Sequence, residues 1–519
     1  MKLILLSFIS AVLAITGASC VEELDEDVLL HFRDLAEHPI EINTASRSRL
    51  LSCGLFSRYQ VASLTDYIRN GGDILSYAEL GLVDGFNPAL AEALEQFTVL
   101  RSQYPPGMKR SFKPESSLIL NASAKSGGRQ ARGLRYTLEA GDRAEFHWTL
   151  RKSYDSPAKG LGTLSAAYYG KRIPGKLILG DFNARFGQGL LQWSGFSLSS
   201  LSSVSAFSRN GTGLSPSSSA TSSLKGIAGE LNLGYWTVWA AWSFAGRLPF
   251  ASVSRTGRKA TFGLAAVSDG VSADWRIGAK DISFYGEAAC RYSGAAAALA
   301  GLKWIPSYGT GTAFLVRWCD PRFGREFSGA AAGVESGGLA ATIDTGIRLS
   351  DGLRQCKLLA TYTREFSLAG ITLSPAVRIS ERFRPDDEDS WRTDLRADLR
   401  ANWQGWELNG RYNILVYKDF AWLWYAEGGY VSDTLKLYMR FSLFRIDNWD
   451  DRISVYERDA RGAFNVPARY GRGWSVSLFA QLKAWKHSRF NLRLETVQYP
   501  WNLTEKPGSA EVKLQYEWR

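Results

Sequence analysis

The sequence predicts a mainly β fold, a transmembrane antiparallel β-barrel of roughly 16–20 strands, preceded by a small all-α domain. Three observations support it. The 519 residues include 50 Gly, 18 Trp, 22 Tyr and 26 Phe but only 3 Met and 4 His, a composition that favours strands over helices. Most of the chain alternates apolar and polar residues with period two. The charge also splits sharply between a short acidic segment and a long basic one.

The first 20 residues read as a signal peptide. A positive start at Met1–Lys2 precedes an apolar run from Leu3 to Ile15 and a small-residue tail ending at Cys20. The tail partly resembles a bacterial lipoprotein cleavage site, so a lipid anchor at Cys20 and ordinary cleavage both stay open. No later stretch reaches about 18 uninterrupted apolar residues, so no transmembrane helix is expected.

Residues 21–100 contain 14 Asp or Glu and 5 Arg, a net charge of −9, whereas residues 104–519 carry 55 Lys or Arg and 37 Asp or Glu, a net charge of +18. Tyr104–Gly107, with two prolines and a glycine, breaks the chain between them. We therefore expect a signal peptide over 1–20, an acidic domain over 21–103 and the barrel over 104–519.

The acidic segment predicts short helices. Apolar residues at helical spacing run from Glu22 to His38, and a second helix ends near Cys53. A third spans 58–70, and a capping box at Ser76–Glu79 opens a fourth, which extends to Val83. The last spans 88–97, with proline at its start.

Two turns in this segment resemble the hairpins of a tandem helix-hairpin-helix domain, as found in periplasmic DNA receptors of bacterial competence. They are Cys53-Gly54-Leu55-Phe56-Ser57 and Asp84-Gly85-Phe86-Asn87-Pro88. The resemblance implies backbone N–H groups aimed at DNA phosphates. It gives the candidate DNA-binding or partner-binding residues Gly54, Leu55, Phe56, Arg58, Gly85, Phe86 and Asn87.

Two departures from that family favour a protein-docking role over DNA binding. Phe56 and Asn87 stand where the family has its second glycine. A domain with a net charge of −9 also repels a polyanion, and Arg58 is the only cation beside either hairpin.

Period-two alternation dominates the rest of the chain. In 394–403 the charged or polar set Asp394, Arg396, Asp398, Arg400 and Asn402 alternates with Leu395, Ala397, Leu399, Ala401 and Trp403. The segments are about ten residues long, the length of a tilted transmembrane strand. The last segment places Val512, Leu514, Tyr516 and Trp518 on one face. Because an arginine facing lipid is costly, the cations are expected in the lumen, loops and turns, giving a cationic interior.

Residues 196–225 interrupt the alternation with Ser, Gly, Thr and Ala. They could form a long outer loop or a segment folded into the lumen, and a mobile surface loop is the favoured interpretation.

Two further regions concentrate glycine, charge and aromatic residues. They are 180–190, with Asp181 and Arg185, and 458–474, with Asp459 and Arg461. Both resemble segments of a family of outer-membrane proteins that join a helix-hairpin-helix domain to a barrel. We expect either a network of Asp181, Arg185, Asp459 and Arg461 lining a constriction, or ordinary lumen ion pairs beside glycine turns.

Enzyme signatures are absent from the sequence. The four histidines have no metal-ligand spacing, and neither GxSxG nor HExxH occurs. No catalytic residue, metal or other cofactor is therefore predicted. His147, inward by alternation, is the only plausible base for a barrel hydrolase.

These observations predict an outer-membrane protein of a Gram-negative bacterium with its N-terminal domain in the periplasm. The favoured function is non-enzymatic: a barrel for passage or assembly in outer-membrane lipid, with the acidic domain docking a periplasmic or outer-membrane protein. The first alternative is DNA binding and uptake through the hairpins below a basic pore. The second is a barrel hydrolase.

Overall fold

The computed structural model describes most of the chain between Pro39 and Arg519. The described residues are 39–45, 47–53, 55–56, 58–86, 90–91, 94–100, 114–140, 143–154, 162–170, 175–194, 201–209, 211–218, 223–244, 248–257, 259–279, 281–307, 310–324, 327–383, 391–460, 465–502 and 506–519. The predicted signal peptide, Cys20 and the predicted helix at 22–38 lie outside these residues.

In the N-terminal region, the helices with described bounds and a two-stranded parallel sheet pack around one apolar core, to which helical residues near Leu90 also contribute. The elements are β1 (Ile40–Glu41), α3 (Arg47–Ser52), α4 (Arg58–Gly71), α5 (Tyr77–Leu80) and β2 (Thr98–Val99). The core includes Ile42, Leu50, Leu51, Phe56, Val61, Leu64, Ile74, Leu80, Leu94 and Phe97. This apolar core holds the described elements of the region together.

The predicted capping box at the start of α5 is confirmed. The Ser76 hydroxyl accepts the Glu79 backbone N–H at 3.1 Å, and the Glu79 carboxylate accepts the Leu75 N–H at 2.8 Å. Helix α4 matches the prediction over 58–70 to within one residue, whereas α5 ends at Leu80 rather than Val83.

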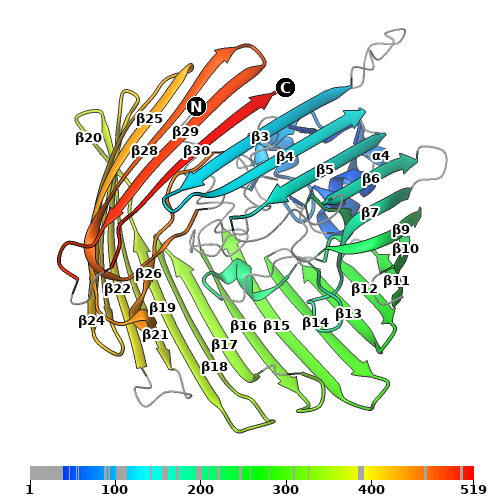
Figure 1. Ribbon diagram of the computed structural model, residues 1–519. Helices are drawn as coiled ribbons and strands as arrows, with labels where there is room; N and C mark the ends of the chain where they lie inside the picture. The colour runs from blue at the N-terminus through cyan, green and yellow to red at the C-terminus, as the bar shows by residue number, and fades with distance from the viewer. Residues whose placement is uncertain are drawn as a thin grey trace.

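The rest of the chain forms a closed antiparallel barrel (Figure 1). Its first half consists of β3 (Glu115–Lys125), β4 (Arg129–Ala140), β5 (Ala144–Lys152), β6 (Thr163–Gly170), β7 (Gly175–Arg185), β9 (Leu224–Leu233), β10 (Trp236–Ser243), β11 (Leu248–Thr256), β12 (Ala260–Val267), β13 (Gly270–Ala279), β14 (Ile282–Arg291) and β15 (Ala296–Ser307). The second half consists of β16 (Thr310–Cys319), β17 (Ser328–Ser336), β18 (Leu339–Ile347), β19 (Arg354–Thr363), β21 (Ile371–Phe383), β22 (Trp391–Trp403), β23 (Trp406–Val416), β24 (Phe420–Val431), β25 (Leu435–Ile446), β28 (Gly471–Trp485), β29 (Ser488–Gln498) and β30 (Ser509–Trp518). Strand β3 pairs with β30 from Leu118–Trp518 to Lys125–Glu511 and closes the ring.

The ring therefore has 24 strands among the described residues, and the prediction of roughly 16–20 was too low. That prediction allowed about 20 residues for a strand and its connection, which suits a barrel with longer loops. Many connections here need only two residues, as at 234–235, 337–338 and 404–405. A short strand, β20 (Phe366–Leu368), adds only an edge pairing to β21.

The two ends of the barrel differ. Apart from 268–269, the two-residue connections lie at the end where β30 finishes and β3 begins, and the N-terminal helices lie at this same end (Figure 1). The longest connections, 186–223 and 447–470, leave the opposite end. Short turns on the side of the chain termini and long loops on the other side are typical of outer-membrane barrels.

The barrel is apolar outside and polar inside, as the alternation predicted. On β22, Leu395 and Leu399 are 39% and 51% exposed on the outer face, whereas Arg396 and Asp398 form an ion pair inside. On β30, Leu514 faces outward while Glu511, Gln515 and Glu517 are buried. An apolar outer face around a polar interior suits a barrel wall whose outer surface contacts lipid.

Two long connections fold into the barrel instead of away from it. Insert 1, residues 186–218, contains the 3-10 turn η2 (Val204–Phe207) and the strand β8 (Gly213–Pro216). Insert 2, residues 447–470, contains η3 (Trp449–Asp451), β26 (Ile453–Ser454) and β27 (Ala468–Arg469). The favoured interpretation of 196–225 as a mobile surface loop was wrong for its described residues. Insert 1 contacts inward-facing residues of the wall, and because the lumen is itself polar, a segment rich in Ser and Gly can be buried there.

Candidate gate in the barrel lumen

Ahead of insert 1, strand β7 bends at Gly180, where its pairing with β6 ends. This glycine has φ +97°, and a Cβ atom there would lie 2.0 Å from the Leu164 carbonyl oxygen, so only glycine fits. Below the bend, Lys176 and Glu230 form an ion pair at 3.3 Å with both side chains fully buried. The Lys176 ammonium also donates to the Leu214 carbonyl of β8 at 2.5 Å, which ties the insert to the wall.

Aromatic packing and wall carboxylates hold insert 1 in place. The Phe186 ring lies 5.3 Å from the Trp239 ring and 4.4 Å from the Phe250 ring, between centroids. Glu287 accepts the backbone N–H groups of Gln188 at 2.7 Å and Leu190 at 3.1 Å. Further along the wall, Glu335 accepts the backbone N–H of Val204 at 2.7 Å. The two carboxylates thus satisfy backbone donors that would otherwise be buried without partners.

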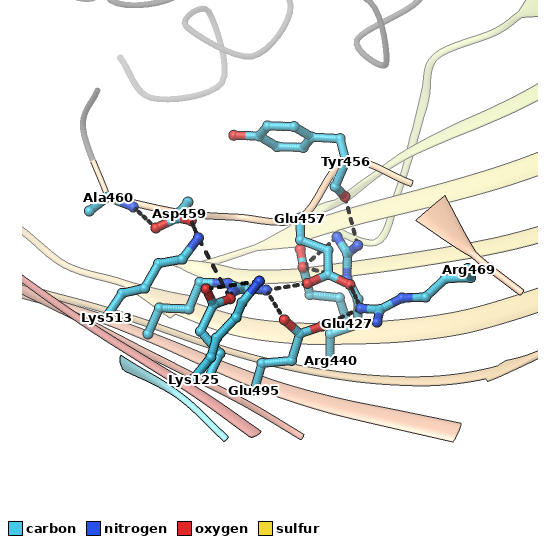
Figure 2. A network of polar contacts seen from close by, with 12 residues as sticks. Lys125, Glu427, Arg440, Tyr456, Glu457, Asp459, Ala460, Arg469, Glu495 and Lys513 are labelled. Atoms are coloured by element: carbon cyan, nitrogen blue, oxygen red, sulfur yellow. Dashed lines mark hydrogen bonds and ion pairs between the residues drawn. The ribbon is translucent and has the colours of Figure 1, made fainter. Parts of the chain in front are cut away.

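Insert 2 is held mainly by ion pairs (Figure 2). Its Glu457 accepts from Arg469, also of the insert, and from Arg493 of β29 at 2.5 Å. Arg493 is 1% exposed and also contacts Glu495 at 2.9 Å and Glu511 at 3.0 Å. One buried guanidinium therefore joins the insert to strands β29 and β30.

A second cluster holds the middle of insert 2 against β23–β25. Glu427 binds Arg440 at 2.7 Å and Arg458 of the insert at 2.8 Å. Arg458 also reaches Glu407 at 3.2 Å, and Arg440 donates to the Tyr456 carbonyl at 2.7 Å. Removing one partner of such a buried network leaves an uncompensated charge, which typically costs about 3–5 kcal/mol.

The start of insert 2 is fixed at the mouth of the barrel. The Asp451 side chain is fully buried and accepts the backbone N–H groups of Lys418 at 3.0 Å and Asp419 at 2.8 Å. Arg392 of β22 donates to the Asp450 carbonyl at 2.7 Å and to the Arg452 carbonyl at 3.2 Å. Contacts therefore extend along the length of the insert.

The predicted lumen residues do not meet in one network. Asp181 accepts the Leu164 N–H at 2.8 Å and the Ser223 hydroxyl at 3.1 Å, and Arg185 donates to the Ser194 carbonyl at 3.2 Å. Asp459 instead binds Lys513 of β30 at 2.6 Å. Arg461 lies outside the described residues.

Of the four predicted residues, Asp459 takes part in an ion pair inside the barrel, and the larger charged clusters consist of residues that the sequence analysis did not single out. The main charged residues are Glu427, Arg440, Glu457, Arg469, Arg493 and Glu495. The alternation places those of β24, β25 and β29 inside. It cannot reveal which of them meet an insert that lies 16 or more residues away in the chain.

The N-terminal region is attached to the barrel through α3. Arg49 pairs with Glu145 at 2.7 Å and Glu139 at 3.2 Å, beside the connection from β4 to β5. Arg47 donates to the Gly234 carbonyl at 2.6 Å, and α3 also lies against β8 of insert 1. Burial opposes the charged form of Arg49, but Glu145 and its neighbours outweigh it and raise the pKa of Arg49 above its ordinary value. The region thus touches both the wall and insert 1.

The hairpin residues contribute to the domain core. Phe56 is buried and its ring lies 6.0 Å from that of Phe86, and Leu55 packs against the same core. Gly85 has φ +86° and lies against Tyr59, where a Cβ atom would be 2.7 Å from the ring. Gly54, Asn87 and the Arg58 side chain are outside the described residues, so binding through these turns stays a prediction.

His147, the candidate base, has only part of a catalytic arrangement. It lies opposite Ser165 in the β5–β6 register and 3.6 Å from Glu145. Ser165 is fully buried, and its hydroxyl has no hydrogen-bond partner among the described residues. Glu145 is already engaged by Arg49 and by the Tyr169 hydroxyl. A nucleophile needs a hydrogen bond to its base and access for substrate, and neither is present here.

The described part of the chain holds no cluster of three or more His, Cys, Asp or Glu residues suited to a metal ion. None of its helices is long and apolar enough to cross a membrane. The described cysteines, Cys53, Cys290, Cys319 and Cys356, form no disulfide bond with one another.

No protein-family model matches the chain. No curated protein matches it either. Among solved structures, it is similar to the translocation pore of the P pilus usher PapC, with 8% identity over 78% of this chain and 98% of that chain and a TM-score of 0.40. Pseudomonas aeruginosa OccK11 (OpdR) has 9% identity over 80% and 99% of the two chains, with a TM-score of 0.33. Pseudomonas aeruginosa OccK9 (OpdG) has 10% identity over 78% and 97%, with a TM-score of 0.32.

Proposed function

We propose that the chain is a gated passage channel of the outer membrane, whose N-terminal domain lies in the periplasm and docks a partner protein. The observation that carries this proposal is the pair of inserts held inside the ring. A barrel's diameter grows with its strand number, and rings of 16–18 strands already enclose an aqueous channel. A ring of 24 strands therefore encloses more space than its wall side chains fill, and segments that are not part of the wall occupy that space.

Both inserts are attached by contacts that can be broken without unfolding the wall. Strands β7 and β9 pair up to Phe182–Leu224, and β25 and β28 pair up to Ile446–Gly471, without any contribution from the inserts. The inserts add hydrogen bonds, ion pairs and aromatic contacts to an already closed sheet. We infer that they close the lumen and that their displacement opens it.

The N-terminal domain is well placed to control insert 1. It contacts β8 through α3 and the wall through Arg49, so a partner that moved the domain would disturb both. The acidic charge of residues 21–100 suits a partner with a basic surface. We keep the helix-hairpin-helix identity of this domain, the signal peptide and a lipid anchor at Cys20 as parts of the proposal.

Removing the inserts tests the passage function. In one variant a Gly-Ser linker replaces 184–222, in a second it replaces 449–468, and a third carries both changes. Proteoliposomes are then exposed to sugars of increasing size, and swelling is recorded. The double variant should admit sugars that the unaltered protein excludes.

The control variant carries the same linker in place of 349–352, an exposed connection between β18 and β19, and should behave like the unaltered protein. A mobility shift between unheated and heated samples on a denaturing gel shows that each variant forms its barrel. Equal swelling of a folded double variant and the unaltered protein would refute the gate.

Partner docking has a separate test. Complexes are purified from native membranes with the tagged full chain and with a chain lacking residues 39–103. A protein recovered with the first and lost from the second supports docking, whereas the same set of proteins from both contradicts it.

A further inference from the structure

We propose that the N-terminal domain docks its partner through a leucine patch, consisting of Leu75, Ala78 and Leu82, and that the partner covers this patch with a segment bearing apolar side chains and Lys or Arg. The proposal rests on the docking function above and names the surface and the chemistry of the partner. Leu75 and Leu82 are 71% and 80% exposed, and no other large apolar side chain described in the domain is exposed. Ala78 between them is exposed as well.

The leucine patch is compact because both of its ends are tied to Glu79. The Leu75 backbone N–H donates to the Glu79 carboxylate at 2.8 Å, and the Leu82 backbone N–H donates to the Glu79 carbonyl at 3.0 Å. Ala78 and Glu79 belong to α5, the short helix between the two leucines. The exposed apolar side chains therefore form one surface instead of isolated positions, which any protein surface has.

Buried neighbours hold the leucine patch in its exposed position. Ile74 precedes Leu75, is fully buried, and forms two hydrogen bonds of 2.9 Å with the Asn43 side chain. Val83 follows Leu82 and is 3% exposed. Because each exposed leucine adjoins a residue fixed in the core, neither can turn inward without disturbing that core. A surface that is ordered before binding loses little conformational entropy when a partner docks.

The segment that carries the leucine patch is acidic. Residues 71–100 include five carboxylates and no Lys, Arg or His. All five arginines of the domain lie before residue 70, and two of them, Arg47 and Arg49, bind the Gly234 carbonyl and Glu145 of the barrel. A partner can therefore supply the basic side chains that this segment itself lacks.

Two carboxylates adjoin the leucine patch in the chain. Asp84 is exposed, two residues after Leu82. Glu79 accepts the Leu75 N–H and the Tyr67 hydroxyl, and these hydrogen bonds lower the pKa of Glu79, so its negative charge persists at neutral pH. An apolar contact flanked by negative charge fits a protein segment whose apolar side chains alternate with lysines or arginines.

The same charges disfavour other occupants of the leucine patch. Residues 22–38 of this chain carry seven carboxylates and one arginine, a net charge of −6, so the acidic segment repels them. A second copy of the chain would bring the same acidic segment against itself. DNA and anionic lipid headgroups would also add negative charge to it. A basic protein segment is the occupant that the charges favour.

Site-specific photo-cross-linking in native membranes tests the proposal. The full chain carries a benzophenone amino acid at position 82 or, as a control, at position 65, because Thr65 of α4 is also exposed. Position 82 should give an adduct with another protein, and mass spectrometry should map the adduct to a segment with apolar residues and Lys or Arg. Position 65 should not give this adduct, and added salt should lower the yield at position 82.

A pair of substitutions in the chain cross-linked at position 82 shows whether the patch itself binds. Leu75→Ser with Asp84→Lys should lower the adduct yield about tenfold, because burial of one leucine contributes at least that factor to affinity. Both residues are exposed, so the domain should stay as resistant to trypsin as before. The matched control, Leu349→Ser with Asp351→Lys in the exposed connection between β18 and β19, should leave the yield unchanged.

Equal adduct yields at positions 82 and 65, or equal yields in the patch and control variants, would overturn the proposal. So would an adduct with residues 22–38, with a second copy of the chain, with lipid, or with a segment that has no basic residue. If a partner is lost on deletion of residues 39–103 but position 82 gives no adduct, docking stands and the leucine patch is the wrong surface. If the deletion loses no partner, docking fails and this inference fails with it.

Discussion

The N-terminal domain and the barrel are built from the same residue types arranged in opposite ways. In the domain, Leu64 and Ile74 are fully buried, whereas in the barrel Leu399 is on the outside and Arg493 is 1% exposed inside. The domain gathers its apolar side chains in a core, while the barrel has an apolar outer face and a polar lumen. The same substitution should therefore have opposite consequences in the two regions.

The largest effect is expected inside the barrel. Arg493→Ala would leave Glu457, Glu495 and Glu511 without their shared guanidinium, at a cost of about 3–5 kcal/mol in unfolding free energy. Unfolding in lipid vesicles measures this. Arg445→Ala is the matched control, because Arg445 is half exposed and its pair with Asp447 should contribute less than about 1 kcal/mol. Equal losses for the two variants would show that the buried network does not hold insert 2.

A smaller effect is expected on the outer face. Leu399→Arg places a charge in lipid and should cost about 2–4 kcal/mol if the site lies near mid-membrane. Arg400→Leu should cost less, because the lumen tolerates substitution and only partly screened charge interactions are lost. Vesicle unfolding of the two variants gives their order. The reverse order would mean that the inside–outside assignment of β22 is wrong.

The buried thiol of the domain should make its stability depend on alkaline pH. Burial raises the pKa of Cys53 to about 11. Since the unfolded thiol loses its proton near pH 8.5–9, the stabilisation is complete below that pH and is lost as pH rises toward 11. Denaturant unfolding of the 21–103 fragment should show a loss of about 2 kcal/mol over this window. In the Cys53→Ala variant, the loss of unfolding free energy with rising pH should be smaller. An unchanged pH profile would show that the thiol is not the cause.

The smallest effect is expected when DNA is added to the acidic domain, because we predict almost no binding. At a net charge of −9, and with Phe56 in the core rather than at a glycine position, residues 21–100 should not bind duplex DNA appreciably at physiological salt. A titration of labelled duplex with this fragment decides the matter. Micromolar or tighter binding that weakens with salt would instead favour the DNA-uptake alternative.

The sequence predicts local features of both regions well because they depend on nearby residues. The capping box at Ser76–Glu79 and the alternation of β22 and β30 each involve fewer than 15 consecutive positions. The number of strands was underestimated because connection lengths vary, and two-residue turns such as 404–405 leave little signal.

The contacts of the two inserts could not be predicted because they join residues that are distant in the chain. Arg493 meets Glu457 across 36 residues, and Glu287 meets Gln188 across 99. Closing the ring brings them together. Insert 1 was also misread because polarity usually indicates exposure to water, and inside this barrel it is compatible with burial.

Single-channel conductance tests the central claim most directly, since it reports whether the two inserts close the lumen. The unaltered protein, the 184–222 replacement, the 449–468 replacement and the double variant are compared in planar bilayers at the same salt concentration. The account predicts that each replacement raises conductance and that the double variant conducts most, with the 349–352 control matching the unaltered protein. Equal conductance in all four folded proteins would contradict it.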